Sequence, residues 1–268
     1  MLLRNRIPTR VGVRTPEATR PKILWQGTAS TGNLNELTDF TSGYDGAWLS
    51  GAATAAASTT QKKTGTHSYQ MNIDVSGGSS GARLAKTQNG VSPPPLLADQ
   101  YYSCWYWVPQ HITVPVWWIV FQWKHAGTEL GASDPLYSVN ILNRTENAQS
   151  KMYLRAYRYV GNDGAYNTTG AQFVDSAPAG INVPVATWFH MEARFKFHRT
   201  GGVFTMWQDG VKLWDLQNIV TLYDYGAQPD GRPYQWAPSN YSDALTPTTV
   251  ITYADELKIT DGRWGPVV

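Results

Sequence analysis

The segment WFHMEARFKFHRTGGVFTMWQDGVKLWDL, residues 188–216, decides the fold class because it contains three consecutive strand patterns. Every second residue from Phe189 to Phe197 is apolar, and every second residue from His190 to His198 is polar. Side chains alternate between the two faces of a strand, so this pattern predicts a half-buried antiparallel strand. Arg199-Thr-Gly-Gly and Asp209-Gly210 separate the runs, and an Asp-Gly pair between alternating strands is a strong hairpin signal. The segment therefore predicts a three-stranded meander.

Similar short alternating runs fill most of the chain, and clusters of Gly, Pro, Asn, Asp and Ser separate them. The further runs lie at 67–75, 81–87, 101–108, 116–125, 136–142, 151–160 and 249–260. The sequence contains no amphipathic helix pattern longer than two turns and no repeat of fixed period. This number of strands in one domain predicts an all-β fold, a two-sheet antiparallel jelly-roll sandwich of the concanavalin A-like kind.

Length and composition are those of one large β domain, which we expect to span residues 23–268. The chain of 268 residues has 12 Trp and 15 Tyr, and only 16% of its residues are charged. A chain of this size buries enough surface to fold without a disulfide or metal, and the single Cys104 is expected to be a small buried hydrophobe. The net charge of +2 argues against a nucleic-acid partner. No apolar stretch approaches the roughly 20 residues of a membrane span.

Residues 1–22 differ from the rest because they carry six basic residues, one acidic residue and three prolines. We expect a flexible basic N-terminal arm, as termini usually are. The alternative is an arm that docks on a partner subunit, in self-assembly or in a virion, or on an anionic surface. The segment has no apolar core of a secretory signal. We therefore expect an extracellular, virion or surface location reached after removal of a signal or by another route.

The run SKMYLRAYRYVG, residues 150–161, indicates a binding surface. One face of this strand carries Tyr153, Arg155, Tyr157 and Tyr159, and the other is mostly apolar. Tyrosine and arginine on an open sheet can stack on flat apolar rings and hydrogen-bond to hydroxyls or carboxylates. A sugar polymer presents these groups, so the pattern predicts carbohydrate binding without deciding whether the sugar is also cut.

Two other strands carry candidate ligand-binding residues. Arg83, in SSGARLAKT (79–87), is either a surface arginine or a guanidinium that pairs with a substrate carboxylate. In VWWIVFQWKH (116–125), alternation places Val120, Gln122 and Lys124 on one face. This polar pair either faces water at a sheet edge or forms a patch in a ligand groove. The opposite face of the run carries Ile119, Phe121, Trp123 and His125, and His125 is a substrate-binding candidate if a bulge turns it towards the ligand.

The segment QWAPSNYSDALTP (235–247) reads as a loop before the final strand, and it contains Trp236, Asn240 and Tyr241. Loops of this composition often carry ligand contacts, although the loop can also be packed by its own aromatic residues.

Hydrolytic, metal and nucleotide chemistry have weaker support. Asp255 and Glu256 are adjacent, so they point to opposite faces and do not form a glycoside hydrolase dyad. Asp255 is a candidate ligand of a structural calcium ion, but one carboxylate is weak support. The five histidines lack zinc spacing, and no GxSxG, phosphate-loop or GxGxxG motif is present. No cofactor is expected to be required.

Four segments together resemble the heparin-lyase-like polysaccharide lyases. They are ILWQGTASTGNLNELTDF (23–40), GTHSYQMNIDVSGGSSGARL (65–84), WWIVFQWKH (117–125) and the region from residue 188 to the NYSD and YADE motifs of the last 30 residues. The resemblance covers roughly residues 23–262. It implies a concanavalin A-like jelly roll whose concave sheet holds an anionic polysaccharide.

The resemblance also implies a reaction, β-elimination, in which a Tyr or His removes the proton next to a uronic carboxyl. Gln122 and Arg83 match the residues that neutralise the developing charge, and Tyr241, or a tyrosine of the 153–159 strand, is the candidate base. Lyases of this kind usually place a histidine two residues after the glutamine, where this chain has Lys124.

Two classes of function follow. The first is a jelly-roll protein that binds an acidic polysaccharide and either cleaves it by β-elimination or only holds it. The alternative is a non-enzymatic structural or adhesive subunit, in a phage virion or a surface assembly, because a fold does not by itself decide function.

Overall fold

The computed structural model describes residues 20–37, 46–87, 99–125, 134–165, 171–223 and 234–267. Within these ranges the chain forms two antiparallel sheets and one short 3₁₀ helix, Asn35–Leu37. The first sheet has eight strands, in the order β13 (Val211–Ile219), β12 (Gly202–Gln208), β11 (Trp188–Lys196), β6 (Asp99–Trp107), β15 (Thr249–Thr260), β4 (Ser68–Asp74) and β3 (Ala52–Ser58), with β1 (Ile23–Gly27) paired to β15.

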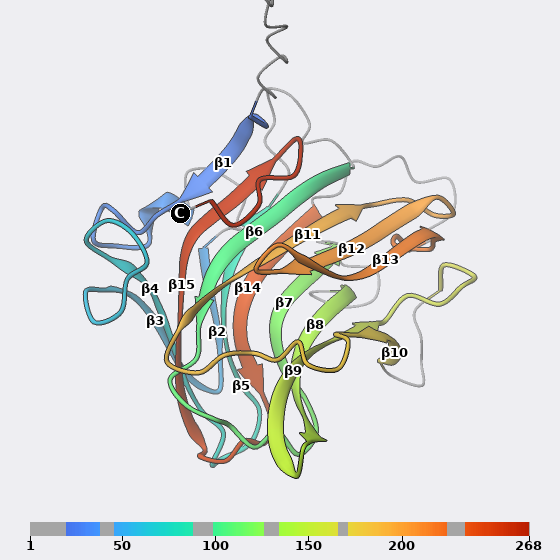
Figure 1. The fold of residues 1–268 in the computed structure, drawn as a ribbon. Coiled ribbons are helices and arrows are strands. Elements are labelled where there is room, and N and C mark those ends of the chain that lie inside the picture. The colour runs from blue at the N-terminus through green and yellow to red at the C-terminus, as the bar shows by residue number, and fades with distance from the viewer. Residues whose placement is uncertain are drawn as a thin grey trace, which may run out of the picture.

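The second sheet has seven strands, in the order β10 (Gln172–Ser176), β9 (Gln149–Arg158), β8 (Asp134–Glu146), β7 (Trp118–His125), β14 (Tyr234–Ser242), β5 (Ser80–Thr87) and β2 (Gly46–Ser50). Figure 1 shows β15, β6 and β11 of the first sheet running across the strands of the second. The predicted jelly-roll sandwich is therefore confirmed.

The meander read from residues 188–216 is present in the first sheet. Antiparallel pairing joins β11 to β12 and β12 to β13. Asp209 and Gly210 have φ values of 49° and 82°, and a two-residue hairpin turn of this kind requires positive φ at both positions. Glycine adopts such a φ without cost and aspartate tolerates it, which explains the Asp-Gly pair.

The core lies between the sheets and is rich in aromatic rings. Trp123 of β7 stacks on Phe195 of β11, with ring centroids 4.9 Å apart and planes 8° from parallel. Tyr106 of β6 donates a hydrogen bond across the sandwich to the Ser239 carbonyl, at 2.6 Å. Cys104 is fully buried, as expected. The inward residues thus come from the alternating runs of both sheets.

Five strands were not predicted from the sequence, and one of them is the five-residue β1. β2, β3 and β10 are short or rich in alanine and serine, so their apolar alternation is weak. β14 was read as a loop because it contains Pro238, and proline is rare in central strands. Pro238 lies where the register between β14 and β7 shifts, so the strand accommodates it.

The two ends of the described chain meet on the first sheet. β1 begins at Ile23, and the Lys22 N–H donates to Asp261 at 2.7 Å. The preceding residues, 1–19 of the predicted arm, lie outside the described residues. Near the C-terminus, the N–H groups of Trp264 and Gly265 donate to the buried Glu192 carboxylate, at 2.6 and 3.1 Å. No helix within the described ranges is long and apolar enough to cross a membrane.

Candidate functional site

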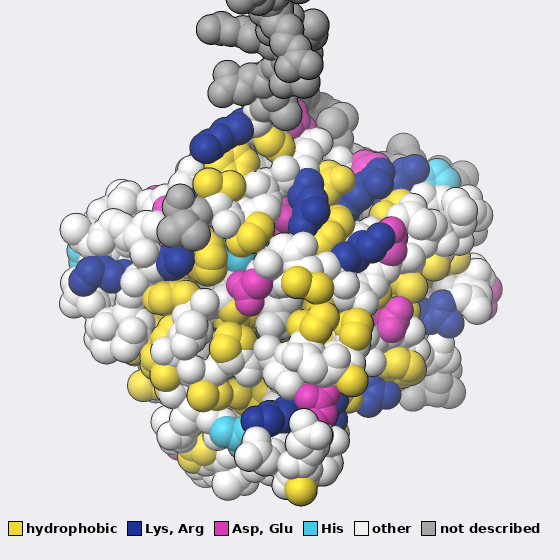
Figure 2. Space-filling view, in the orientation of Figure 1, with side chains coloured by type: hydrophobic (Ala, Val, Ile, Leu, Met, Phe, Trp, Pro, Cys, Tyr) yellow, Lys and Arg dark blue, Asp and Glu magenta, His cyan; other side chains and the backbone are white. Residues whose placement is uncertain are grey.

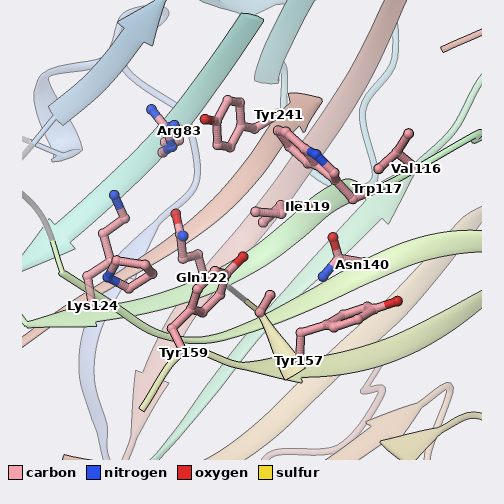
Figure 3. Close-up of a pocket in the computed structure, with 12 residues that line it drawn as sticks. Arg83, Val116, Trp117, Ile119, Gln122, Lys124, Asn140, Tyr157, Tyr159 and Tyr241 are labelled. Atoms are coloured by element: carbon pink, nitrogen blue, oxygen red, sulfur yellow. The ribbon is translucent and has the colours of Figure 1, made fainter. Parts of the chain in front are cut away.

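A pocket of about 640 Å³ opens on the face of the second sheet that points away from the core, and we call it the second-sheet pocket. Its volume lies within the range of small-molecule and cofactor sites. Figure 3 shows its side chains converging from neighbouring strands. The lining residues are Arg83, Val116, Trp117, Ile119, Gln122, Lys124, Pro135, Asn140, Tyr157, Tyr159, Ala171 and Tyr241.

Strand register explains why residues distant in sequence meet here. Gln122 of β7 pairs with Ser138 of β8, which pairs with Tyr157 of β9. Directly opposite residues on neighbouring strands project to the same face, so these three side chains form one row across the sheet. In the next row, Ile119 pairs with both Asn140 and Tyr241.

Two irregularities change which residues face the pocket. The register shifts between Ile119 and Phe121 of β7 against β8, and between Pro238 and Tyr241 of β14 against β7. An extra residue in one strand breaks the alternation of faces. Ile119 consequently lines the pocket, while Val120 is buried in the core. The expectation that Val120 shares a face with Gln122 is therefore wrong.

Gln122 provides a buried amide at the pocket. Its side chain is 3% exposed, and its Oε1 atom has no hydrogen-bond partner among the described residues. A buried polar atom normally has a partner, because burying it without one costs about 1–3 kcal/mol. The amide is thus poised to interact with a group that enters the pocket.

Arg83 and Tyr241 form a second polar group. The Arg83 guanidinium lies 3.9 Å from the centre of the Tyr241 ring, and the Tyr241 hydroxyl lies beside it (Figure 3). Burial lowers the pKa of Arg83, and the interaction with Tyr241 opposes this shift. Trp117 contacts the same ring edge-on at 4.7 Å, so the phenol is held between a cation and an indole.

The position of Tyr241 requires glycine on the adjacent strand. Gly81 of β5 pairs with Tyr241, and a Cβ atom added at Gly81 would lie 2.5 Å from Cδ2 of the tyrosine ring. No real Cβ contact is that short, so only glycine lets the ring lie flat against β5.

The charged residues in the described lining of the pocket are all basic. Arg83 and Lys124 line it, and Lys124 is 7% exposed. No acidic side chain is among the lining residues in the described part of the chain. Two cations in a concave, partly desolvated site attract an anionic group.

The tyrosine strand is placed as its alternation predicts, but it divides between two environments. Tyr157 and Tyr159 line the pocket. Tyr153 instead lies against Arg144, 4.6 Å from its guanidinium, and Arg155 lies between Tyr157 and Phe173. Burial raises the pKa of Tyr157, and Arg155 opposes this shift only in part. The Tyr157 ring is therefore a neutral phenol.

Two residues predicted to contact a ligand lie in the core instead. Trp236 is fully buried, with its ring 5.4 Å from Phe121. Asn240 is also fully buried, and its Nδ2 donates to the carbonyls of Met71 and Val250, at 3.1 and 2.9 Å. Because residues 234–242 form a strand rather than a loop, these two side chains point between the sheets.

The remaining two predicted residues are His125 and Asp255. The side chain of His125 lies outside the described part of the structure. Asp255 is buried, and its carboxylate accepts the N–H groups of Lys63 and Thr64 at 2.8 and 3.0 Å, which holds that loop to β15. No group of three or more potential metal ligands of the His, Cys, Asp or Glu types occurs among the described residues. Calcium binding stays a prediction.

Sequence reasoning missed Asn140 and Trp117, which both line the pocket. Asn140 donates to Ser138 at 2.9 Å, and both are polar residues of the same parity in an otherwise apolar run. That alternation was a usable signal. Trp117 offered no such sequence signal, because it precedes β7 and its position depends on contacts with Tyr241 and Asp243. The Trp117 Nε1 donates a hydrogen bond to Asp243 at 3.0 Å.

Comparison with known proteins adds information at the level of the fold. No protein-family model matches the chain, and no curated protein matches its sequence. Solved structures do match. An endo-β-1,4-glucuronan lyase from the fungus Trichoderma reesei has a TM-score of 0.61 and 15% identity, covering 90% of this chain and 96% of the other.

Two further structures belong to viruses. The alginate lyase vAL-1 from Chlorella virus has a TM-score of 0.51 and 13% identity, covering 87% of this chain and 99% of the other. A carbohydrate esterase from Shiga toxin-encoding bacteriophage phi24B has a TM-score of 0.51 and 14% identity, covering 90% and 98%. The chain therefore has the jelly-roll fold of these structures.

Proposed function

We propose that this protein binds an acidic polysaccharide in the second-sheet pocket and cleaves it by β-elimination. The observation that carries the proposal is the pocket's polar composition. Arg83, Lys124 and the Gln122 amide line it, with no carboxylate among the described lining residues. A uronic acid unit offers the anionic group that such a site favours.

Elimination fits this composition better than hydrolysis. Glycoside hydrolysis usually needs two carboxyl groups flanking the scissile bond, and none lines the described pocket. Elimination needs neutralisation of the uronic carboxylate, a base for the adjacent proton, and a proton for the leaving oxygen. The electron pair of the broken C–H bond forms a carbon–carbon double bond as the glycosidic C–O bond breaks.

In the proposed reaction Arg83 and Gln122 neutralise the substrate carboxyl, and Lys124 takes the position where related lyases have histidine. Tyr241 is the base we favour, because its hydroxyl lies beside the guanidinium that would hold the carboxyl (Figure 3). Tyr159 is the alternative from the tyrosine strand. Tyr157, with its raised pKa, is better suited to stacking on the sugar ring.

The structural neighbours support the substrate class. The glucuronan and alginate lyases act, by their names, on acidic polymers, and their folds match most of this chain. The finer assignment to the heparin-lyase-like group rests on the sequence resemblance and on the positions of Arg83 and Gln122. Extracellular or virion-associated action is part of the same proposal, since polymers of this kind are met outside cells.

The test is ultraviolet absorbance, because elimination creates a conjugated double bond in the product. Alginate, glucuronan, heparin and pectin would each be incubated with the protein. We expect rising absorbance with at least one polymer. If none of the four polymers gave rising absorbance, cleavage would be removed from the proposal. Retarded migration of the protein in a gel containing one of them would then still support binding.

Gln122→Ala tests the assigned role of the amide. We expect turnover to fall by about 10²-fold or more while affinity for the polymer changes little, because the amide acts on charge that develops in the reaction. Rates from absorbance and affinities from gel retardation separate the two effects. Equal losses of turnover and affinity would show that Gln122 binds the ground state instead.

The structural or adhesive subunit remains the second proposal, and the phage protein with a similar fold is compatible with it. The basic segment that motivates it lies largely outside the described residues. Deletion of residues 1–22 would be followed by measurement of the molar mass in solution. A monomer unaffected by the deletion, with a functioning pocket, would argue against an assembly role.

A further inference from the structure

A second concave surface lies on the opposite side of the molecule, on the outer face of the first sheet. It encloses about 380 Å³, and we call it the first-sheet hollow. The residues that define it are Tyr101, Arg194, Trp207, Lys212, Asp215 and Arg263. None of them contributes to the second-sheet pocket, so a ligand here would be bound independently.

Four adjacent strands build the hollow through one cross-strand row. Arg194 of β11 pairs with Tyr101 of β6 on one side and with Thr205 of β12 on the other. Thr205 pairs in turn with Asp215 of β13. Opposite residues of paired strands face the same way, so a ring, a guanidinium, a hydroxyl and a carboxylate line up on the sheet.

Aromatic rings form one wall of the hollow. Tyr101 and Trp207 are stacked, with ring centroids 6.2 Å apart and planes 23° from parallel. The Arg263 guanidinium lies 4.6 Å from the Trp207 ring and donates to the Gly210 carbonyl at 2.9 Å. Trp207 is thereby covered, and the partly exposed Tyr101 supplies the accessible apolar face.

The charged side chains of the hollow are all neutralised by partners. Arg194 donates two hydrogen bonds to the Asp99 carboxylate, at 2.9 and 2.7 Å. Lys212 donates to Asp215 at 2.9 Å, and Arg263 lies 3.4 Å from Glu192. Figure 2 shows the basic and acidic side chains adjoining each other over this region.

The ionisation of these pairs is consistent with their contacts. Hydrogen bonds from Lys212, Gln217 and Thr205 lower the pKa of Asp215 to about 2. The hydrogen bonds to Asp99 raise the pKa of Arg194. The pairs therefore remain ionised near neutral pH, and the hollow offers fixed donors and acceptors without excess charge.

We propose that the first-sheet hollow binds a neutral, hydroxyl-rich carbohydrate. Such a ligand places its apolar ring face on Tyr101 and its hydroxyls against the paired Arg194 and Asp215 side chains. An acidic sugar gains no attraction here, because each cation already has a carboxylate partner. This separates the hollow from the second-sheet pocket, whose described lining includes Arg83 and Lys124 and no acidic residue.

The test is migration of the full chain in native gels that contain a neutral polymer. Barley β-glucan, xyloglucan, arabinoxylan and galactomannan would be compared with alginate and glucuronan. We expect at least one neutral polymer to retard the wild-type protein. Tyr101→Ala should weaken that retardation by about tenfold or more in apparent Kd, because it removes the stacking ring. Tyr101→Phe, which keeps the ring, should retain most of it.

Two further variants test whether a loss of binding arises from misfolding and whether the neutral polymer binds in the second-sheet pocket instead of the hollow. Lys212→Glu changes a half-exposed side chain and places two carboxylates in the hollow, so it should abolish retardation while the melting temperature stays close to that of the wild type. Tyr157→Ala, which should weaken binding in the second-sheet pocket, should leave binding of the neutral polymer intact.

Three results would overturn the proposal. They are no retardation by any neutral polymer, retardation that survives both Tyr101→Ala and Lys212→Glu, and retardation that Tyr157→Ala removes. Failure of the acidic polymers to be cleaved or bound would contradict the proposed function of the pocket and leave this result standing.

Discussion

At the scale of single residues, the tyrosines of β9 show how one alternating run divides between a site and its surroundings. Tyr157 lines the second-sheet pocket, whereas Tyr153, four residues earlier on the same face, lies against the guanidinium of Arg144. Their sequence contexts are alike. The difference arises because the pocket is centred on β7, and Tyr157, not Tyr153, lies in the row that contains Gln122.

This difference gives a matched pair of variants. Tyr157→Ala should weaken polysaccharide binding by about 1–3 kcal/mol if the ring stacks on a sugar, by analogy with stacking on flat bases. Tyr153→Ala should leave affinity unchanged. Retardation in polymer-containing gels measures both, and equal losses for the two variants would show that the effect arises from packing of β9.

At the scale of strands, the contact between β5 and β14 places the Arg83–Tyr241 pair. The absence of a side chain at Gly81 admits the Tyr241 ring. We expect Gly81→Ala to push the ring away from Arg83 and to lower turnover and affinity together. Gly77→Ala is the control, because a Cβ there would meet nothing within 4 Å.

Circular dichroism and melting temperatures would confirm that both glycine variants fold. Normal turnover by a folded Gly81→Ala protein would mean that the position of Tyr241 is unimportant for the reaction, and Tyr159 would then become the favoured base.

The outer face of β11 carries a buried histidine with a pH-dependent effect on stability. Burial, and then the nearby charges of Lys258, Arg263 and Lys63, lower the pKa of His190 to about 3, from 6.5. Between these values the unfolded chain binds the proton more readily than the folded chain. Stability attributable to His190 is thus complete above pH 6.5 and is lost as the pH falls towards 3.

Urea unfolding at pH 7.5 and pH 5 measures this effect. The wild type should lose more free energy of unfolding over this interval than His190→Gln, which cannot take up the proton. Equal losses in the two proteins would indicate that the imidazole has access to water in the folded state.

At the scale of the whole molecule, Asn240 joins the two sheets. It lies on β14 of the second sheet and donates to carbonyls of β4 and β15 in the first, and its Oδ1 accepts from Trp118 at 2.8 Å. Asn240 is therefore part of the architecture. Its polar side chain forms hydrogen bonds with buried groups in the interior. A polar residue in a strand can therefore serve packing between the sheets as well as ligand binding.

Asn240→Ala should mainly lower stability, whereas Asn140→Ala should mainly lower affinity for polysaccharide. The first removes hydrogen bonds to two buried carbonyls and leaves the Trp118 indole N–H without its Asn240 acceptor, so the free energy of unfolding should fall by roughly 2–5 kcal/mol. The second should lower affinity for polysaccharide with a smaller loss of stability. Denaturant unfolding and gel retardation on both variants test this, and weak binding by a fully stable Asn240→Ala protein would contradict it.

Much of the molecule followed from local patterns. The meander, its Asp-Gly turn, the buried face of β9 and the sandwich class were all predicted from period-two alternation and turn residues. Gln122, Lys124 and Arg83 were singled out as polar residues in apolar strands, and all three line one pocket. The placement of β14 was not predicted, because Pro238 gave a loop signal that a bulge overrides.

The sequence by itself determined which residues lie on opposite faces of each regular strand, because that alternation depends only on backbone geometry. Only the tertiary structure decided which faces meet. The order β9-β8-β7-β14-β5 brings together Tyr157, Gln122 and Arg83 from three distant segments, and two register shifts turn Ile119 and Tyr241 into the pocket. Strand order and bulges are set by packing between the sheets, which no local pattern encodes.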